Sequence, residues 1–154
     1  VFMDPLDDPF AAIERELGAC ALGTGADTII IDIHCEATSE KQSMGYFVDG
    51  RATLVVGTHT HAPTADHRVL PAGTGLISDV GMTGDFQSVI GMHKDEPLSR
   101  FLRKLPGSKF APAEGPATLC AVAVETDDRT GLASRIGAVR LGGILEEAKP
   151  AFWG

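Results

Sequence analysis

Two short apolar runs on either side of one helix-length segment place the strongest constraint on how this chain can fold. TIIIDIH, residues 28–34, and ATLVVG, residues 52–57, are rich in β-branched residues and too short for buried helices, so both are predicted strands. Because the first run is apolar without alternation, we expect its strand to be covered on both faces. With a helix between them, the two strands predict a parallel crossover unit.

The segment between the strands, residues 38–50, has the pattern of a helix. Met44, Phe47 and Val48 recur at helical spacing and are expected to form its buried stripe. Ser39, with Gln42 three residues later, resembles a capping box at the start of this helix. A helix that connects two parallel strands predicts an α/β fold.

The remaining elements are predicted from local signals. Asp8 followed by Pro9 marks the start of a first helix, and residues 96–105 form another amphipathic helix. The short runs 67–70 and 75–81 are further strand candidates. TLCAVAVETD and LASRIGAVRL, on either side of the turn DRTG, predict an antiparallel β-hairpin. The chain is therefore expected to be one α/β unit with an antiparallel appendage.

Composition narrows the class of protein. The 154 residues are 44% hydrophobic and 22% charged, which is ordinary for one globular domain, and no run is long enough to cross a membrane. A net charge of −8 argues against binding to duplex nucleic acid, which needs a basic face. The three cysteines are widely spaced and outside any CxxC pattern, which predicts reduced thiols in a cytoplasmic protein.

Three of the five histidines fall at the ends of the two predicted strands. His34 closes the first strand, and His59 and His61 follow the second within GTHTH. If this segment is extended, the rings of His59 and His61 point the same way, and ligands collect at the carboxyl ends of parallel strands. Neutral imidazoles are common metal ligands, so the three histidines are a candidate metal site. The ordinary alternative is a core histidine bonded to a carbonyl group and a pair of loop histidines in solvent.

The neighbouring polar residues have several possible roles. Cys35 faces the opposite side of the strand on alternation, so it is excluded as a ligand. Glu36 faces the same side as the strand histidine and either orients a ligand or pairs with Lys41. His67, on the outer side of a turn, and His93, among charged residues, are predicted to be surface residues.

Two kinds of metal site fit these residues. Three histidines alone would hold one zinc ion with an open water position, as in a mononuclear hydrolase or hydratase. A two-metal site for phosphoryl chemistry would also need a bridging carboxylate or amide. Asp32 and Asp79 are the inward-facing acidic candidates, and neither is obviously placed to bridge. The residues alone leave both alternatives open.

The chain resembles a known family in three motifs, HCEATSEK, GTHTH and DVGMTG, in this order and spacing. This family is the YmdB-like metallophosphoesterases, bacterial members of the calcineurin-like superfamily with activity on 2′,3′-cyclic nucleotides. The segments FMDPLDDPF and VIGM are also similar, so the resemblance covers nearly all of residues 2–140. It implies a phosphodiesterase with a four-layer αββα metallophosphoesterase sandwich and a dinuclear site of iron or manganese.

By this resemblance, His34 and His59 hold one metal ion and His61 holds the other. The family's bridging ligands and its general acid belong to a region that would precede Val1. The resemblance thus implies that residues 1–154 are the C-terminal portion of one metallophosphoesterase domain, with one of its two sheets and the covering helices. Such a chain would be inactive or nearly so by itself. Four further residues are expected near the ligands or the substrate: Glu36, Thr60, Asp79 and Thr83.

The predicted function is metal-dependent hydrolysis of a small phosphodiester, in which a metal-bound hydroxide attacks phosphorus in line. We expect two metal ions, iron or manganese or both, and a homo-oligomer, with neither duplex nucleic acid nor a membrane as a partner. The alternatives are a mononuclear zinc hydrolase that uses the three histidines and a non-catalytic regulatory or assembly module. The number of metal ions in the intact protein, two, one or none, separates the three.

Overall fold

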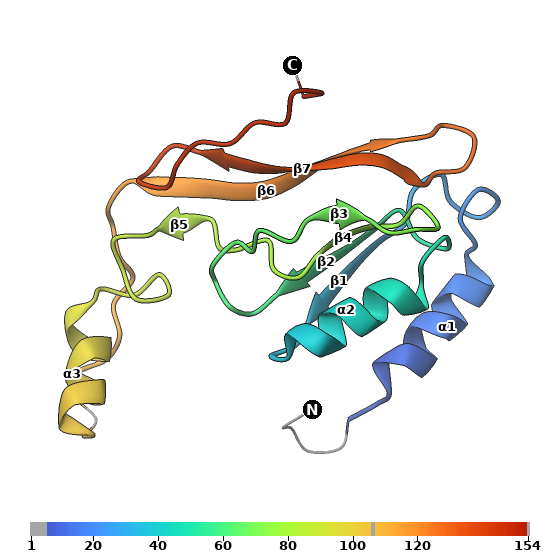
Figure 1. The fold of residues 1–154 in the computed structure, drawn as a ribbon. Coiled ribbons are helices and arrows are strands. Elements are labelled where there is room, and N and C mark those ends of the chain that lie inside the picture. Colours follow the sequence, from blue (N-terminus) through green and yellow to red (C-terminus); the bar gives the residue numbers. More distant parts are fainter. Residues whose placement is uncertain (1–5, 106, 154) are drawn as a thin grey trace.

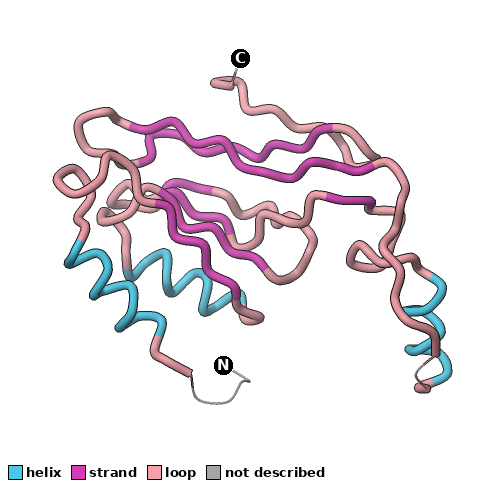
Figure 2. The backbone as a smooth tube through the Cα atoms, turned by 180° about the vertical axis from the view of Figure 1, so that it is seen from behind, coloured by secondary structure: helices cyan, strands magenta, loops and turns pink. Residues whose placement is uncertain are grey.

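The computed structural model describes residues 6–105 and 107–153, in which two sheets and two helices are stacked and a third helix stands apart (Figure 1). Helices α1 (Pro9–Ala19) and α2 (Thr38–Phe47) lie on one face of a four-stranded sheet. An antiparallel hairpin lies on the opposite side of this sheet, as the view from behind also shows (Figure 2). The α/β fold class predicted from the sequence is confirmed.

The four-stranded sheet has the strand order β1-β2-β4-β3. Its members are β1 (Ile30–His34), β2 (Leu54–Thr58), β3 (Arg68–Val69) and β4 (Gly75–Ile77). β1, β2 and β4 are parallel, and β3 pairs antiparallel with β4. The predicted crossover unit is confirmed, and its register places His34 opposite Thr58. The carboxyl ends of β1 and β2 therefore lie side by side.

The burial of β1 differs from the expectation. We expected a strand covered on both faces, but β1 is an edge strand and only Ile31 of its five residues is fully buried. Ile30 is 63% exposed, and Asp32 and His34 on the same face are exposed as well. The physical reason is the position of the hairpin, which contacts β3 and β4 at the other edge of the sheet.

A second sheet is formed by β5 (Gly84–Asp85), β6 (Ala117–Thr126) and β7 (Ala133–Leu141). The predicted hairpin is confirmed, with β6 and β7 antiparallel along almost their whole length. We expected this chain to supply one sheet, but it contains strands of two. The hairpin folds over β3 and β4 through β7 instead of extending the first sheet.

The helix starts agree only in part with the sequence signals. α1 begins as predicted, because the Asp8 carboxylate accepts the N–H group of Phe10 at 2.9 Å and caps the helix. α2 has Ala37 at its N-cap position and no side-chain cap, so the predicted capping box is wrong. Ser39 lies inside the first turn of α2, where its hydroxyl is past the cap position.

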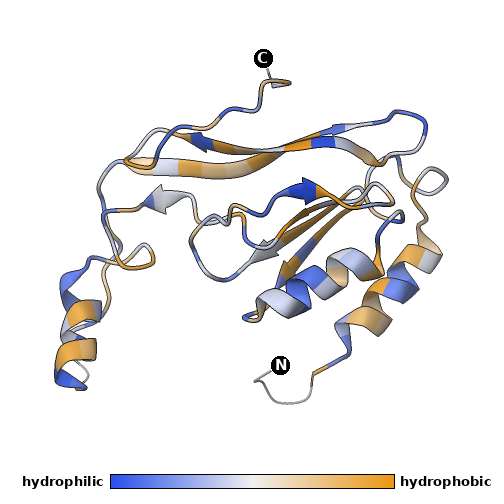
Figure 3. Cartoon of the chain, in the orientation of Figure 1, coloured by the Kyte–Doolittle hydropathy of each residue, from blue (hydrophilic) through white to orange (hydrophobic). Residues whose placement is uncertain are grey.

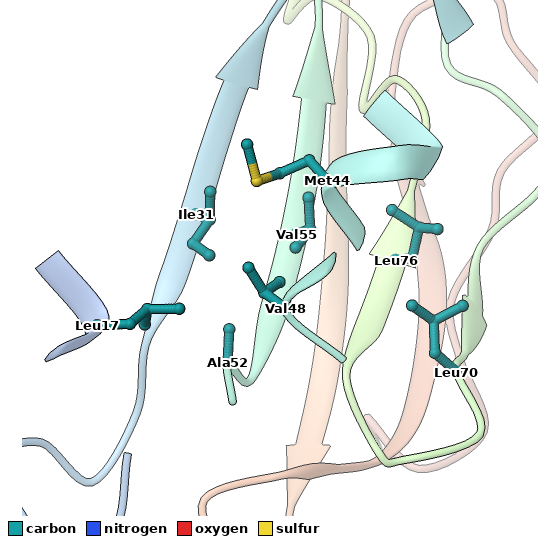
Figure 4. Packing of buried hydrophobic residues seen from close by; sticks show 8 residues of the cluster. All are labelled: Leu17, Ile31, Met44, Val48, Ala52, Val55, Leu70 and Leu76. Carbon is teal, nitrogen blue, oxygen red and sulfur yellow. The ribbon is translucent and has the colours of Figure 1, made fainter. Parts of the chain in front are cut away.

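The apolar core lies between the two helices and the first sheet (Figure 4). It consists of Leu17, Ile31, Met44, Val48, Ala52, Val55, Leu70 and Leu76. Met44 and Val48 of the predicted helical stripe are buried, as expected. Phe47 is 40% exposed and instead packs edge-on against Phe10, with ring centroids 5.3 Å apart. The core therefore joins α1 to the crossover unit.

Helix α3 (Asp95–Arg103) confirms the predicted amphipathic segment, with its end two residues earlier than expected. It stands away from both sheets, and its hydrophobic residues appear as orange bands on the ribbon (Figure 3). The exposed apolar side chains of this helix are Leu98, Phe101 and Leu102, and Leu105, just after the helix, is also exposed. No helix in the described part of the chain has the length and apolar character needed to span a membrane.

Gly57 allows a close approach between β2 and the segment that follows β4. A Cβ atom at Gly57 would lie 1.8 Å from the carbonyl oxygen of Ser78 and 2.8 Å from Cδ of Lys41. The N–H group of Val80 donates to the Gly57 carbonyl at 2.9 Å, which fixes the two segments at this distance. Only glycine fits here without movement of the backbone.

Gly57→Ala should lower the free energy of unfolding by about 3 kcal/mol, at the upper end for overpacking, because Ser78 contributes rigid backbone to the clash. Urea unfolding measures the change. Gly18→Ala in α1 is the matched control, since a Cβ atom there meets nothing within 4 Å. That control should raise stability by up to about 1 kcal/mol through helix propensity. A Gly57→Ala protein as stable as wild type would contradict the prediction.

Asp66 joins the loop after GTHTH to the end of β4. Its Oδ1 accepts the Thr64 hydroxyl at 2.6 Å, and its Oδ2 accepts the Ser78 hydroxyl, also at 2.6 Å. Further bonds come from the Ser78 N–H group and the Arg68 guanidinium. Burial by itself raises the pKa of Asp66, but these hydrogen bonds outweigh it and lower the pKa to about 2.

Ionised Asp66 should therefore stabilise the fold. A lowered pKa gives stability that is fully present above the usual value of 3.8 and is lost as the pH falls toward about 2. The contribution at neutral pH is on the order of 2 kcal/mol. Asp66→Asn should lose it and show a flatter decrease of stability in acid, measured by urea unfolding across this pH range. Asp128→Asn, at an exposed position, should show the same decrease of stability with falling pH as wild type. If the stability of Asp66→Asn and of wild type decreased equally with falling pH, ionised Asp66 would not stabilise the fold.

Candidate metal centre

Two histidines meet where β1 and β2 end. His59 Nδ1 lies 3.3 Å from His34 Nε2, and the ring centroids are 5.1 Å apart at an interplanar angle of 76°. Two imidazole nitrogens bound to one tetrahedral ion at about 2.1 Å are about 3.4 Å apart. The pair therefore has the spacing of two ligands of one metal ion.

His61 lines the same pocket, an open hollow of about 190 Å³. Its Nδ1 lies 3.1 Å from the carbonyl oxygen of Ile90. A carbonyl oxygen only accepts hydrogen bonds, so Nδ1 of His61 is the protonated nitrogen. The lone pair is then on Nε2, which remains as the metal-binding nitrogen of this ring.

The three histidines do not converge on a single point. In residues 6–105 and 107–153, no three His, Cys, Asp or Glu side chains form a group that could hold a metal ion. His34 and His59 are in direct contact, whereas the ring of His61 bonds to the carbonyl group of Ile90, a residue that does not line the pocket. The structure thus brings together two of the three candidates, and their assignment as ligands stays a prediction.

The backbone at GTHTH is not the extended segment that we assumed. β2 ends at Thr58, and His59 and His61 have φ angles of 142° and 65°. Their positions come from a tight turn, so the argument from strand alternation is wrong. Ile90, whose carbonyl group accepts the hydrogen bond from His61, also has a positive φ of 49°. Non-glycine residues in such conformations cost about 1–3 kcal/mol each and concentrate at functional sites.

Asp79 holds the turn that carries the histidines. Its carboxylate pairs with Lys41 Nζ at 2.9 Å, and both side chains are only 2% exposed. Oδ2 also accepts the N–H group of Thr60 at 2.8 Å, and Oδ1 accepts that of Gly81 at 2.9 Å. Burial by itself raises the pKa of Asp79, but these bonds together lower it below its usual value. Both oxygens accept hydrogen bonds from the backbone or Lys41, so Asp79 positions the turn, and we do not expect it to bridge two metal ions.

Lys41 supports the turn of the candidate site through Asp79, and the sequence reasoning missed this role. A pair with Lys41 was one of the two roles expected for Glu36, but Lys41 pairs with Asp79, and Glu36 is exposed. A signal for this was present, because Lys41 precedes Met44 and Val48 by three and seven residues and so belongs to their buried stripe. A lysine on an apolar helix face needs a buried counter-charge.

The other candidate residues are less central. Thr60 contributes its backbone N–H group, and its hydroxyl bonds within the turn. Thr83 is exposed and is not among the residues that line the pocket. His93 is exposed as predicted, with Nδ1 3.7 Å from Asp95 Oδ2. His67, predicted at the surface, is half-buried, and its Nδ1 is buried without a hydrogen-bond partner in the described residues.

Comparison with known proteins agrees with the motifs. A family model described as YmdB-like protein matches residues 1–139. The chain belongs to the YmdB-like family. Within the family, a 2′,3′-cyclic-nucleotide 2′-phosphodiesterase of Bacillus subtilis (strain 168) is 47% identical over 135 residues, 88% of this chain and 50% of that protein. The chain spans about half the length of the curated relatives it matches.

Solved structures share the fold of this YmdB-like chain. A hypothetical protein from Thermus thermophilus gives a TM-score of 0.82 at 42% identity, over 92% of this chain and 54% of that one. A novel phosphatase from Mycoplasma pneumoniae gives a TM-score of 0.80 at 33% identity, over 92% and 50% of the two chains. The family predicted from the three motifs is confirmed, and so is the metallophosphoesterase type of fold.

Lys41→Met should lower the free energy of unfolding by about 3–5 kcal/mol, because it leaves the buried Asp79 charge without its partner. Urea unfolding at neutral pH measures the loss. Lys109→Met, at an exposed position, is the control and should stay within about 0.5 kcal/mol of wild type. Equal stabilities of the two variants would show that the ion pair contributes nothing to the fold.

Proposed function

We propose that this chain supplies the histidine ligands of a two-metal phosphodiesterase that hydrolyses small phosphodiesters such as 2′,3′-cyclic nucleotides. The observation that carries the proposal is the pair of ring nitrogens of His34 and His59, 3.3 Å apart at the carboxyl ends of β1 and β2. The substrate class comes from the activity in the name of the Bacillus subtilis relative.

The donor set fits metal ions. Neutral imidazoles suit iron and zinc, and by the family resemblance the ions are iron or manganese. His34 and His59 would hold one ion, and His61 would hold the other. Bound metal ions supply Lewis-acid activation of the phosphoryl group and of water. We expect the remaining ligands to come from elsewhere, because Asp79 already accepts three hydrogen bonds that hold the turn, from Lys41 and from two backbone N–H groups.

The residues of this chain hold and orient the ligands. Gly57 brings β2 close to Ser78, and Asp79 fixes the turn between His59 and His61 through Thr60. The net charge of −8 would by itself repel a phosphodiester anion. Cations at the histidines would reverse the local field, which is a second reason to expect metals at this pocket.

The mononuclear alternative has less support. A single zinc ion would need the ring nitrogens of His34, His59 and His61 around one point, but only His34 and His59 are in direct contact. The part of the chain that the structure describes contains no three-ligand group for an ion. Relatives about twice as long as this chain have room for the bridging ligand and the general acid of a two-metal centre.

The test uses protein expressed from the complete reading frame that contains this chain. We expect two metal ions per protein and hydrolysis of both bis-p-nitrophenyl phosphate and a 2′,3′-cyclic nucleotide. His59→Ala should lower kcat/KM by at least about 100-fold. Loss of a contact that supports a metal ligand typically costs about 10- to 100-fold, and loss of the ligand itself should cost more. His93→Ala, at an exposed histidine outside the pocket, is the matched control and should be silent.

The metal count separates the alternatives. One ion per protein with full activity would favour the mononuclear hydrolase. A protein without metal or turnover would favour a non-catalytic module of the same fold. Equal losses in His59→Ala and His93→Ala would contradict the ligand assignment.

A further inference from the structure

We infer that Asp32 and Thr58 are positioning residues that fix the tautomer of His34, so that Nε2, the nitrogen facing His59, has the lone pair. The inference rests on the proposed function, because it concerns a ligand of the proposed centre. The tautomer itself is a property of the metal-free chain and can be measured without any ion.

Two hydrogen bonds connect Thr58 of β2 with Asp32 and His34 of β1. The Thr58 hydroxyl lies 3.2 Å from Asp32 Oδ1 and 3.1 Å from His34 Nδ1. A hydroxyl has one proton to donate, and a carboxylate only accepts. Thr58 therefore donates to Asp32 and accepts from the Nδ1–H group of His34.

The opposite direction is less favourable. If Thr58 donated to Nδ1 of His34, the carboxylate of Asp32 would lose this donor. A hydrogen bond to an ionised acceptor is roughly twice as strong as one between neutral groups. The carboxylate thus determines the direction of both bonds, and the proton of the His34 ring stays on Nδ1.

The strand register builds this arrangement. In the parallel pair of β1 and β2, His34 lies opposite Thr58. Asp32 precedes His34 by two residues, so both side chains are on the same face of β1. A slip of one residue would turn the Thr58 hydroxyl to the other face. All three side chains are on strands, whereas His59 and His61 are on the strained turn.

A hydrogen-bond acceptor at Nδ1 also determines the tautomer of His61, independently of His34. Its Nδ1 is bonded to the Ile90 carbonyl, another group that only accepts. Two of the proposed ligands therefore have an acceptor at Nδ1 and a lone pair on Nε2. Without such an acceptor, a neutral histidine prefers the Nε2–H tautomer in water. His34 would then have to change its tautomer before Nε2 could bind a metal ion.

The first measurement reads the tautomer by long-range ¹⁵N–¹H correlation in the metal-free protein expressed from the complete reading frame, at about pH 8, above the usual histidine pKa of about 6.5. We expect Nδ1–H at His34 in wild type and in Thr58→Ser, which keeps the hydroxyl. Thr58→Val, of nearly the same shape, should shift His34 to Nε2–H, and Asp32→Ala should lower the Nδ1–H fraction. The exposed His93 should be the same in every variant. Nε2–H in wild type, or an unchanged tautomer in Thr58→Val, would overturn the inference.

The second measurement titrates the same proteins with Zn²⁺, a probe that binds imidazole well. Loss of the supporting contact in Thr58→Val should weaken Zn²⁺ binding by about 10- to 100-fold, whereas Thr58→Ser should bind as wild type does. Equal affinities of Thr58→Val and wild type would overturn the positioning role. If wild type has the expected tautomer but binds no Zn²⁺, the hydrogen-bond assignment stands and the proposed metal centre fails.

Discussion

The ion pair between Lys41 and Asp79 connects the core of this chain to its candidate site. Burying two charges costs several kcal/mol each in lost hydration, so such a pair persists only where every charge has partners. Asp79 has them, because two backbone N–H groups and the lysine share its oxygens. One of these N–H groups belongs to Thr60, between His59 and His61. The carboxylate that balances a lysine of α2 therefore also holds the turn of the candidate ligands.

The histidines are positioned in two physically different ways. His34 is on a strand, and its ring bonds to Thr58 across the parallel register of β1 and β2. His59 and His61 are on a turn with positive φ angles, which is unfavourable by itself and needs tertiary contacts to persist. The buried carboxylate of Asp79 and the close approach at Gly57 supply such contacts. We therefore expect a substitution of Asp79 or Gly57 to displace the turn with His59 and His61 more than the strand with His34.

The proposed ligand set is incomplete among the described residues of this chain. Among the described residues, the imidazoles gather at one pocket while the nearby carboxylates are engaged in structural hydrogen bonds. Our proposal of a two-metal phosphodiesterase therefore needs carboxylate or amide ligands from other residues. The relatives it matches are about twice as long as this chain, which fits a centre shared between two parts of one domain.

Local pattern in the sequence was sufficient to predict several parts of this protein. The crossover unit, the hairpin, the Asp8 cap and the motifs that identify the family could all be predicted, because side-chain periodicity and turn residues act within a few positions. The other features depend on contacts between segments that are distant in the chain. The partner of Lys41 lies 38 residues away in the chain, and no local pattern encodes that distance. The exposure of β1 and the positive φ angles at His59 and His61 likewise follow from how the hairpin, β4 and the turn pack together, so only the folded chain could reveal them.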